Sequence, residues 1–206
     1  VAPEEPGLSA AAVTDPVDLA MLARLDAVIA DASAAFDGFD YARALERTEA
    51  FFWWFCDDYV ELVKGRAYNS QGDTQAASAR LALHTALSSI QRLLAPVLPF
   101  AAEEAWSWWN DCSVHRAAWP TPTGVDGDRS LIDPTIEVLT LVRRSKTEAK
   151  QSQRATVASL TIAAPAAVRD ALEQGRADLV DAGSIAELSL VDGDELACES
   201  VLASAG

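Results

Sequence analysis

The sequence contains few of the residues that usually carry catalysis, metal binding or cross-linking. Its 206 residues include two histidines, three cysteines and one methionine. Three widely spaced cysteines suit free thiols in a reducing compartment better than a disulfide framework, so a cytoplasmic location is expected. Cys112 and His115 form a C-x-x-H, but no second pair completes the four ligands of a zinc site. Neither His84 nor His115 has a nucleophile at catalytic spacing, so we expect no hydrolase site.

The sequence also lacks long apolar segments. No uninterrupted run approaches the roughly 20 apolar residues that span a bilayer, which predicts a soluble chain with no membrane partner. The first residues, Val-Ala-Pro-Glu-Glu, have neither the basic nor the apolar region of a secretory signal. Because the chain does not start with methionine, we expect a fragment of a longer protein, with residues 1–14 as a flexible leader.

Positive charge is scarce as well. Sixteen lysines and arginines face 31 aspartates and glutamates, and the net charge of −15 argues against nonspecific binding to nucleic acid. Residues 129–154 are the exception, with six cations and three anions. Local potential governs where a phosphate approaches, within a Debye length of about 8–10 Å. This segment is therefore either a phosphate-binding surface or an ordinary solvated helix face.

Aromatic residues are concentrated in one stretch. Residues 41–68 have the three- and four-residue apolar spacing of a long helix, and residues 51–55 are Phe-Phe-Trp-Trp-Phe. At about 100° per residue, five consecutive rings sweep more than a full turn, so one core cannot cover all of them. At least one ring must face something else. That ring either packs against a neighbouring element or stacks on a flat ligand such as a nucleobase.

The remaining pattern predicts a mainly α-helical protein with a small α/β subdomain. Helices are expected over residues 16–35, 74–94 and from Pro99 onward, with a bend at LLAPVLPF. Residues 120–133 contain two prolines and two glycines and mark a boundary between a helical bundle (15–133) and a second unit (134–206). The second unit is expected to contain helices at 134–150 and 165–180 and strands near 157–163, 185–191 and 196–202.

Four segments resemble one protein family. WWFCDDYVELVK is similar to the first helix of the anticodon domain of valyl-tRNA synthetases, and LLAPVLPFAAEEAWSWW resembles a run shared by class I synthetases for several aliphatic amino acids. SVHRAAWP is similar to a short segment that closes the bundle in the valine and isoleucine members. VLTLVRRSKTEAKQSQRATVASLTI resembles a run before a strand in the last domain of the valine members, with Thr147 where serine is typical. The resemblance covers residues 17 to about 191. No heptad repeat follows residue 190, so the coiled-coil arm of many bacterial members is not expected.

The resemblance implies a class I anticodon-binding bundle that recognises valine tRNA as part of a larger synthetase. In that family, ATP- and Mg-dependent attachment of valine occurs on a catalytic domain with HIGH- and KMSKS-like motifs, and neither motif is present here. We therefore expect this chain alone to be inactive and to hold no cofactor. The expected partners are valine tRNA and the rest of the synthetase chain, with the protein a monomer. An isoleucyl-tRNA synthetase domain and a helical module that docks a protein partner through exposed aromatics remain alternatives.

The expected tRNA contacts combine aromatic stacking with charge. Trp54 is the first choice for stacking a base, followed by Phe51 or Trp53. Base edges or phosphates are expected to meet Arg43, Arg47 and Lys64, and Asp58 is expected to accept from an exocyclic amine. The cations expected to hold the tRNA backbone are Arg143, Arg144, Lys146 and Lys150.

Overall fold

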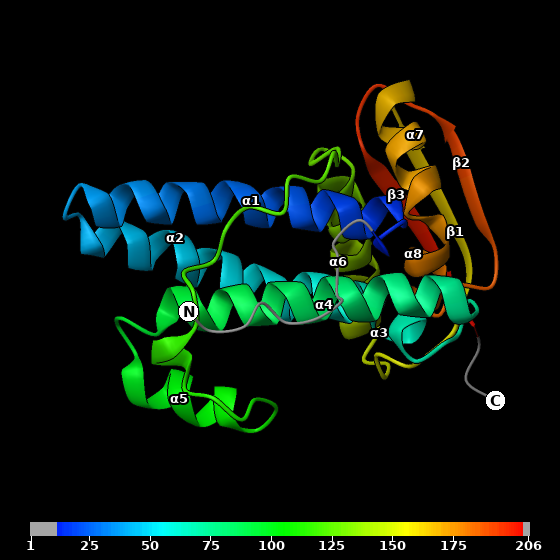
Figure 1. The fold of residues 1–206 in the computed structure, drawn as a ribbon. Coiled ribbons are helices and arrows are strands. Elements are labelled where there is room, and N and C mark those ends of the chain that lie inside the picture. The colour runs from blue at the N-terminus through cyan, green and yellow to red at the C-terminus, as the bar shows by residue number, and fades with distance from the viewer. Residues whose placement is uncertain (1–11, 204–206) are drawn as a thin grey trace.

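The computed structural model describes residues 12–203, which form a helical bundle joined to a small three-stranded sheet (Figure 1). The long helices α1, α2 and α4 run side by side, α5 lies at one end of them, and the sheet lies at the other. The elements in chain order are α1 (Pro16–Asp37), α2 (Tyr41–Trp54), the π-helical turn η2 (Phe55–Tyr59), α3 (Val60–Ala67), α4 (Asp73–Leu94), α5 (Pro99–Ser107), the 3-10 turn η3 (Val114–Arg116), α6 (Ile132–Glu148), β1 (Val157–Ala164), α7 (Ala166–Gln174), α8 (Arg176–Gly183), β2 (Leu188–Asp192) and β3 (Ala197–Leu202). The expected flexible leader falls almost wholly outside the described residues.

The first two helices form an antiparallel hairpin, and an aspartate caps the start of each. The Asp15 carboxylate accepts from the Val17 N–H, and the Asp40 carboxylate accepts from the Arg43 N–H. The left-handed turn residue is Phe39, with φ of 61°, whereas Gly38, which the sequence favours for this role, has φ of −84°. Phe39 adopts this conformation at an exposed hairpin tip, where its ring packs edge-on against that of Tyr41 with 6.4 Å between the ring centroids.

The bend before α5 is confirmed. Pro99 occupies the first turn of α5, where its missing N–H costs nothing. Trp106 is buried in a small cluster with Ala95, Ala102 and Val114, and its indole N–H donates to the Cys112 carbonyl. These contacts fix α5 against the end of α4.

The C-terminal unit is a mixed sheet with strand order β2-β1-β3. The strands β1 and β2 pair side by side in parallel register, and β3 pairs antiparallel to β1. The single helix expected over residues 165–180 is in fact two helices, because the chain breaks at Gly175, which lies against Thr135 of α6. A β-carbon at position 175 would come within 2.7 Å of the Thr135 hydroxyl. This close approach requires glycine.

One hydrophobic core runs through both halves of the described chain. Its buried members include Leu22 of α1, Tyr59 of η2, Val138 of α6 and Ile162 of β1. The proposed boundary near residue 133 is therefore crossed by continuous packing.

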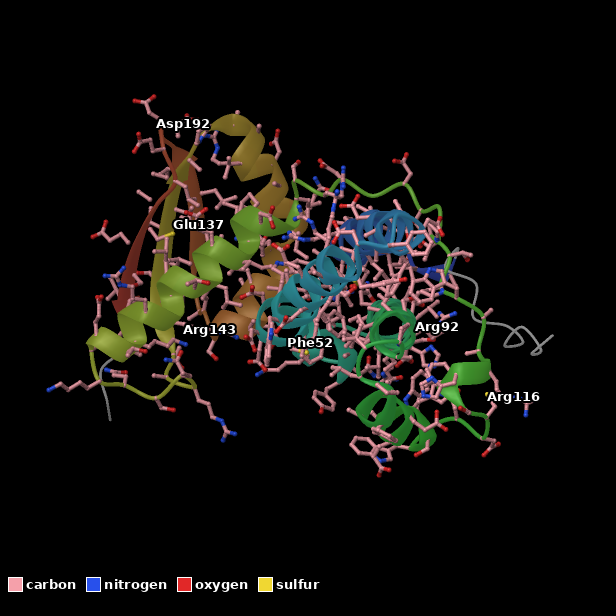
Figure 2. All side chains as sticks on the ribbon, turned by 90° about the vertical axis from the view of Figure 1, so that its left-hand side faces the viewer. Phe52, Arg92, Arg116, Glu137, Arg143 and Asp192 are labelled. Atoms are coloured by element: carbon pink, nitrogen blue, oxygen red, sulfur yellow. The ribbon has the colours of Figure 1, made fainter. Side chains whose placement is uncertain are left out.

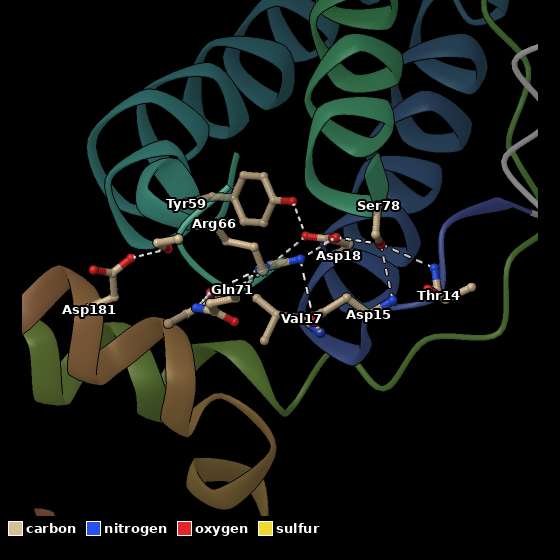
Figure 3. A network of polar contacts seen from close by, with 11 residues as sticks. Thr14, Asp15, Val17, Asp18, Tyr59, Arg66, Gln71, Ser78 and Asp181 are labelled. Atoms are coloured by element: carbon tan, nitrogen blue, oxygen red, sulfur yellow. Dashed lines mark hydrogen bonds and ion pairs between the residues drawn. The ribbon is translucent and has the colours of Figure 1, made fainter. Parts of the chain in front are cut away.

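A buried charged network, defined by Asp15, Asp18, Arg66 and Asp178, ties the two halves together (Figure 3). The Arg66 guanidinium donates to Asp18 of α1 at 2.7 and 2.8 Å and to Asp178 of α8 at 2.8 to 3.1 Å. Burial opposes the charge, but hydrogen bonds to Asp18 and Asp178 hold the pKa of Arg66 above its usual value. Tyr59 and Ser78 also donate to Asp18, which satisfies the buried carboxylate.

Candidate nucleic-acid interface

The aromatic stretch lies on a rod made of α2, η2 and α3, and this rod is not one regular α-helix. Within η2 the Val60 N–H donates to the Phe55 carbonyl, five residues earlier. The wider turn rotates the faces of α3 relative to those of α2, so a regular helical wheel does not hold across it. Accordingly, the ring of Trp54 stacks on that of Tyr59, five residues on, at 6.2 Å. Such π turns occur frequently at functional sites.

Trp54 is half-buried and already has a stacking partner. The guanidinium carbon of Arg24, on α1, lies 4.1 Å from the ring centroid of Trp54. The ring also contacts Phe51, at a centroid distance of 5.5 Å. A base stacking on this face of Trp54 must displace Arg24. No sequence pattern points to Arg24, because its proximity to Trp54 depends on how α1 and α2 pair.

Phe51 does not offer a ring to a ligand, which corrects the sequence-based expectation. Its side chain is 4% exposed and stacks on Phe55 within the core. Position 51 lies on the face of α2 that packs against α1 and α4, along with Ala44 and Thr48. The Phe51 ring, which was expected to stack on a base, is therefore part of the hydrophobic core.

Trp53 is the most exposed ring of the run. It is 54% exposed, and its indole N–H lies 3.4 Å from the Glu49 carboxylate, one turn earlier. Trp53 also borders an apolar groove of about 490 Å³ between α2, α4 and α5. Of the three rings considered for stacking, Trp53 has the face most available to a ligand.

Arg43 and Arg47 are exposed on α2, and within residues 12–203 neither guanidinium makes an ion pair. Positions 43, 47 and 54 lie along one side of α2, because steps of four and seven residues return to nearly the same face. The two arginines therefore lie on the same side of α2 as Trp54, about two and three turns before it, and are exposed to a phosphate or a base edge.

A polar hollow of about 570 Å³ lies where α3, α6 and α8 meet. The Glu61 carboxylate accepts from Lys64 at 2.6 Å and from Arg143 at 3.1 Å, so two cations expected in separate roles share one anion. Figure 2 shows Arg143 on α6 beside the rod. Arg154 also lines the hollow and was not among the predicted contacts. Arg154 could have been predicted as a contact, because it belongs to the cation-rich segment 129–154.

Asp58 lies close to this set on the π turn. Burial, followed by the neighbouring Asp57, raises the pKa of the Asp58 carboxyl, while Arg143 and Arg24 oppose the rise. Asp58 therefore lies within electrostatic reach of both Arg24 and Arg143. We call the surface formed by Arg24, Trp54, Asp58, Glu61, Lys64 and Arg143 the rod face.

The remaining cations of α6 differ in their surroundings. Arg144 is exposed and pairs with Glu148 at 2.8 Å, and Lys150 is exposed just beyond the helix. Lys146 corrects the prediction: it is 1% exposed, and its ammonium donates to the carbonyls of Gln153 and Gly183. Burial, with Arg143 nearby, lowers the pKa of Lys146. Lys146 therefore holds the turn after α6 and does not reach a phosphate.

The described part of the chain has neither a metal-binding cluster nor a membrane-spanning helix. Among residues 12–203, no three His, Cys, Asp or Glu side chains are placed to hold a metal ion together. None of the helices within that range has the length and apolar character needed to cross a membrane.

Comparison with known proteins gives a consistent result. The family model of the anticodon-binding domain of tRNA ligase matches residues 18–162. The chain is 50% identical to the valine–tRNA ligase of Leifsonia xyli subsp. xyli over 95% of its own length and 23% of that protein. It is 48% identical to the valine–tRNA ligase of Thermobifida fusca over 100% of its length, and 46% identical to that of Cutibacterium acnes over 92%. The chain spans 22 to 24% of these relatives.

Proposed function

Because the chain belongs to the family of anticodon-binding domains of tRNA ligases, we propose that it binds the anticodon arm of valine tRNA as part of a valine–tRNA ligase. In this proposal the remainder of the ligase attaches valine to tRNA with ATP and Mg²⁺. The present chain contributes recognition and no catalytic step. It acts in the cytoplasm.

The observation that carries this proposal is the set of cations along the rod. Arg43 and Arg47 are exposed on α2 and form no ion pair with any other described residue. Lys64 and Arg143 both bind the Glu61 carboxylate, in the hollow that Arg154 also lines. Guanidinium and ammonium groups on one surface bind a phosphate backbone despite the net charge of −15, because screening confines each field to about 8–10 Å. Arg144 and Lys150 are further exposed cations at the end of α6.

The exposed rings supply the base contacts. A splayed base stacks on Trp53, or on Trp54 in place of the Arg24 guanidinium. Each stacked base contributes about 1–3 kcal/mol, so one or two stacks with a few phosphate contacts give weak, salt-sensitive binding. Asp58 accepts from an amino group of a base on the rod face.

The first test measures binding of valine tRNA and of a tRNA with a different anticodon at two salt concentrations. Arg47→Ala removes one free guanidinium without breaking an ion pair of the described chain. We expect it to weaken valine tRNA binding several-fold and to lower the salt slope by about 1. Arg116→Ala is the control, because Arg116 is an exposed arginine far from Arg143 (Figure 2). Equal affinity for both tRNAs, with Arg47→Ala unchanged, contradicts the proposal.

Exposed aromatics on α5 favour protein docking as a second candidate function. Phe100 is 89% exposed and Trp108 is 75% exposed, and they lie at the two ends of α5. This candidate predicts that Phe100→Ala and Trp108→Ala leave tRNA affinity unchanged but abolish capture of a protein partner. Loss of tRNA affinity in these variants removes it.

A further inference from the structure

The outer edge of β3 carries backbone groups that no described residue pairs. The Leu160 N–H donates toward β2, so from this residue onward the even-numbered positions of β1 bond to β2 and the odd-numbered ones bond to β3. Thr161 is therefore bonded to Glu199, its partner in register on β3. Because bonding alternates along a strand, the N–H and C=O groups of Cys198 and Ser200 point away from the sheet.

The two edges of the sheet differ in how they are protected. Natural proteins usually guard an open edge with charged side chains or proline, because an unguarded edge pairs with other chains. On β2 such guards are present: Arg176 donates to the Leu188 carbonyl, and Arg169 forms an ion pair with Asp192 at 2.6 Å. β3, Ala-Cys-Glu-Ser-Val-Leu, contains no lysine, arginine or proline, and between residues 12 and 203 no side chain bonds to its outer backbone groups.

A hollow of about 230 Å³ lies beside this edge, between β3 and α6. Its lining comes from three elements and consists of Leu141, Val142, Arg144, Ser145, Glu148, Leu160, Cys198 and Ser200. The volume is below the usual range of roughly 300–1,000 Å³ for small-molecule sites, so it suits single side chains rather than a whole ligand. An open strand edge with a pocket for alternate side chains is what an extended peptide binds when it adds a strand to a sheet.

The charge around this edge favours a cationic partner. Residues 185–203 contain five carboxylates and no lysine or arginine, and Glu199 is exposed on β3 itself. Burial, followed by the Glu137 carboxylate of α6, raises the pKa of Cys198, so a second anion lies near the edge (Figure 2). Arg144 lines the hollow but is paired with Glu148. The carboxylates repel both a phosphate backbone and the like-charged edge of a second copy of this chain.

We propose that the outer edge of β3 binds an extended segment of a partner protein in which apolar residues alternate with lysine or arginine. The segment adds a fourth strand and pairs its backbone with the outer groups of Cys198 and Ser200. Its apolar side chains enter the hollow beside α6, because Cys198 and Ser200 line that hollow. Its cations lie on the opposite face of the sheet, where Glu199 is exposed between Ala197 and Val201. This role needs no tRNA and goes beyond the proposed function.

The test uses the end-blocked peptide Val-Lys-Val-Lys-Val-Lys and the ¹⁵N-labelled full chain. In the free chain the Cys198 and Ser200 amides are expected to exchange rapidly with solvent, whereas the Glu199 amide is protected by its bond to β1. Peptide binding is expected to shift the two outer amides and to slow their exchange at least about tenfold. The shifts are expected on β3 and α6 and not at the Leu190 amide of β2.

Two modified peptides separate backbone pairing from attraction between charges. One carries N-methyl groups on the valines and the other on the lysines, and only one of these two sets of N–H groups can face β3. One version is therefore expected to bind at least about tenfold more weakly than the other, although their charges are equal. The peptide Val-Glu-Val-Glu-Val-Glu is expected not to bind.

Glu199→Lys places a lysine on the edge strand and is expected to weaken peptide binding at least about tenfold. Glu187→Lys is the matched control, because Glu187 is also an exposed glutamate but lies at the opposite edge, just before β2. The same change of charge at that distance is expected to weaken binding less than about threefold. If Glu199→Lys does not fold, the two N-methylated peptides on the wild-type chain still decide.

Three results overturn the proposal: equal binding of the two N-methylated peptides, binding of the glutamate peptide as tight as that of the lysine peptide, or equal losses in Glu199→Lys and Glu187→Lys. If the free chain sediments as a dimer with its Cys198 and Ser200 amides already protected, the edge pairs with a second copy and the proposal fails. Protection of the same two amides by valine tRNA alone assigns the edge to nucleic acid and also contradicts it.

Discussion

Lys146 shows how strongly burial decides the role of a charged side chain. The four cations from Arg143 to Lys150 look equivalent in the sequence, yet one is enclosed by backbone carbonyls, one shares Glu61, and two face solvent. Arg66 shows the same effect more strongly, since it is fully buried and joins two carboxylates from distant helices. Charge alone does not identify a tRNA contact. The surroundings of each group do.

Removing the Arg66 side chain is expected to be severely destabilising. Arg66→Ala leaves Asp18 and Asp178 buried without their cation, and we expect a loss of about 3–5 kcal/mol in the free energy of unfolding. Urea denaturation measures this difference. Arg144→Ala, which breaks an exposed pair with Glu148, is the control and is expected to cost less than about 1 kcal/mol. Similar losses in both variants contradict a structural role for the network.

The three cysteines are expected to differ in reactivity. Burial, followed by Glu137, raises the pKa of the Cys198 thiol to about 11, whereas Cys112 is exposed. Alkylation near pH 8 should therefore modify Cys112 first, and the rate at Cys198 should rise with pH to a midpoint near 11. The unfolded thiol ionises near 9, below the folded one, so stability is lost as pH rises from about 9 through about 11. Mass spectrometry of each thiol tests this order.

At the scale of elements, the helical periodicity of residues 41–68 predicted the rod but not its π turn. The apolar spacing of a π turn closely resembles that of an α-helix, since the difference is a single hydrogen-bond register. That shift placed Trp54 on Tyr59 and moved α3 relative to α2. The same limit explains Phe51, because five consecutive rings show that one must be exposed without showing which. The apolar groove beside Trp53 could not be predicted from the sequence, because it forms only where α2, α4 and α5 meet.

The linker before α6 packs closely against the backbone of α1. Gly127 lies against the backbone of Leu19, so close that a β-carbon would overlap the Leu19 carbonyl. Gly127→Ala is therefore expected to cost about 2–3 kcal/mol, since backbone must move. Gly124→Ala is the matched control: nothing lies within 4 Å, and only its positive φ of 72° opposes alanine, at about 1 kcal/mol. Thermal unfolding compares the two, and an equal cost contradicts this close contact.

At the scale of the whole molecule, the fold class was predictable and the coupling of its parts was not. Proline, glycine and apolar periodicity identified the bundle, the bend at Pro99 and the strands. These patterns also predicted a boundary near residue 133, whereas one hydrophobic core and the Arg66 network extend across the bundle and the C-terminal subdomain. Long-range contacts of this kind leave no local pattern. The net charge of −15 likewise does not describe how the cations are distributed over the surface.

The continuous core predicts a single cooperative unfolding transition. All six tryptophans lie between residues 53 and 119, so their fluorescence reports on the bundle, whereas Cys198 reports on the sheet. Exposure of the Cys198 thiol and the change in tryptophan fluorescence are expected at the same urea concentration. Reaction of Cys198 at clearly lower urea than the fluorescence change would show that the sheet unfolds on its own.

The most direct test of the account is the location of bound tRNA on the chain. Hydrogen exchange with and without valine tRNA gives this location segment by segment. Protection is expected over residues 43–64 and 143–154, where the aromatic rings and the exposed or shared cations lie. Protection confined to α5, or to the open face of the sheet, would contradict it.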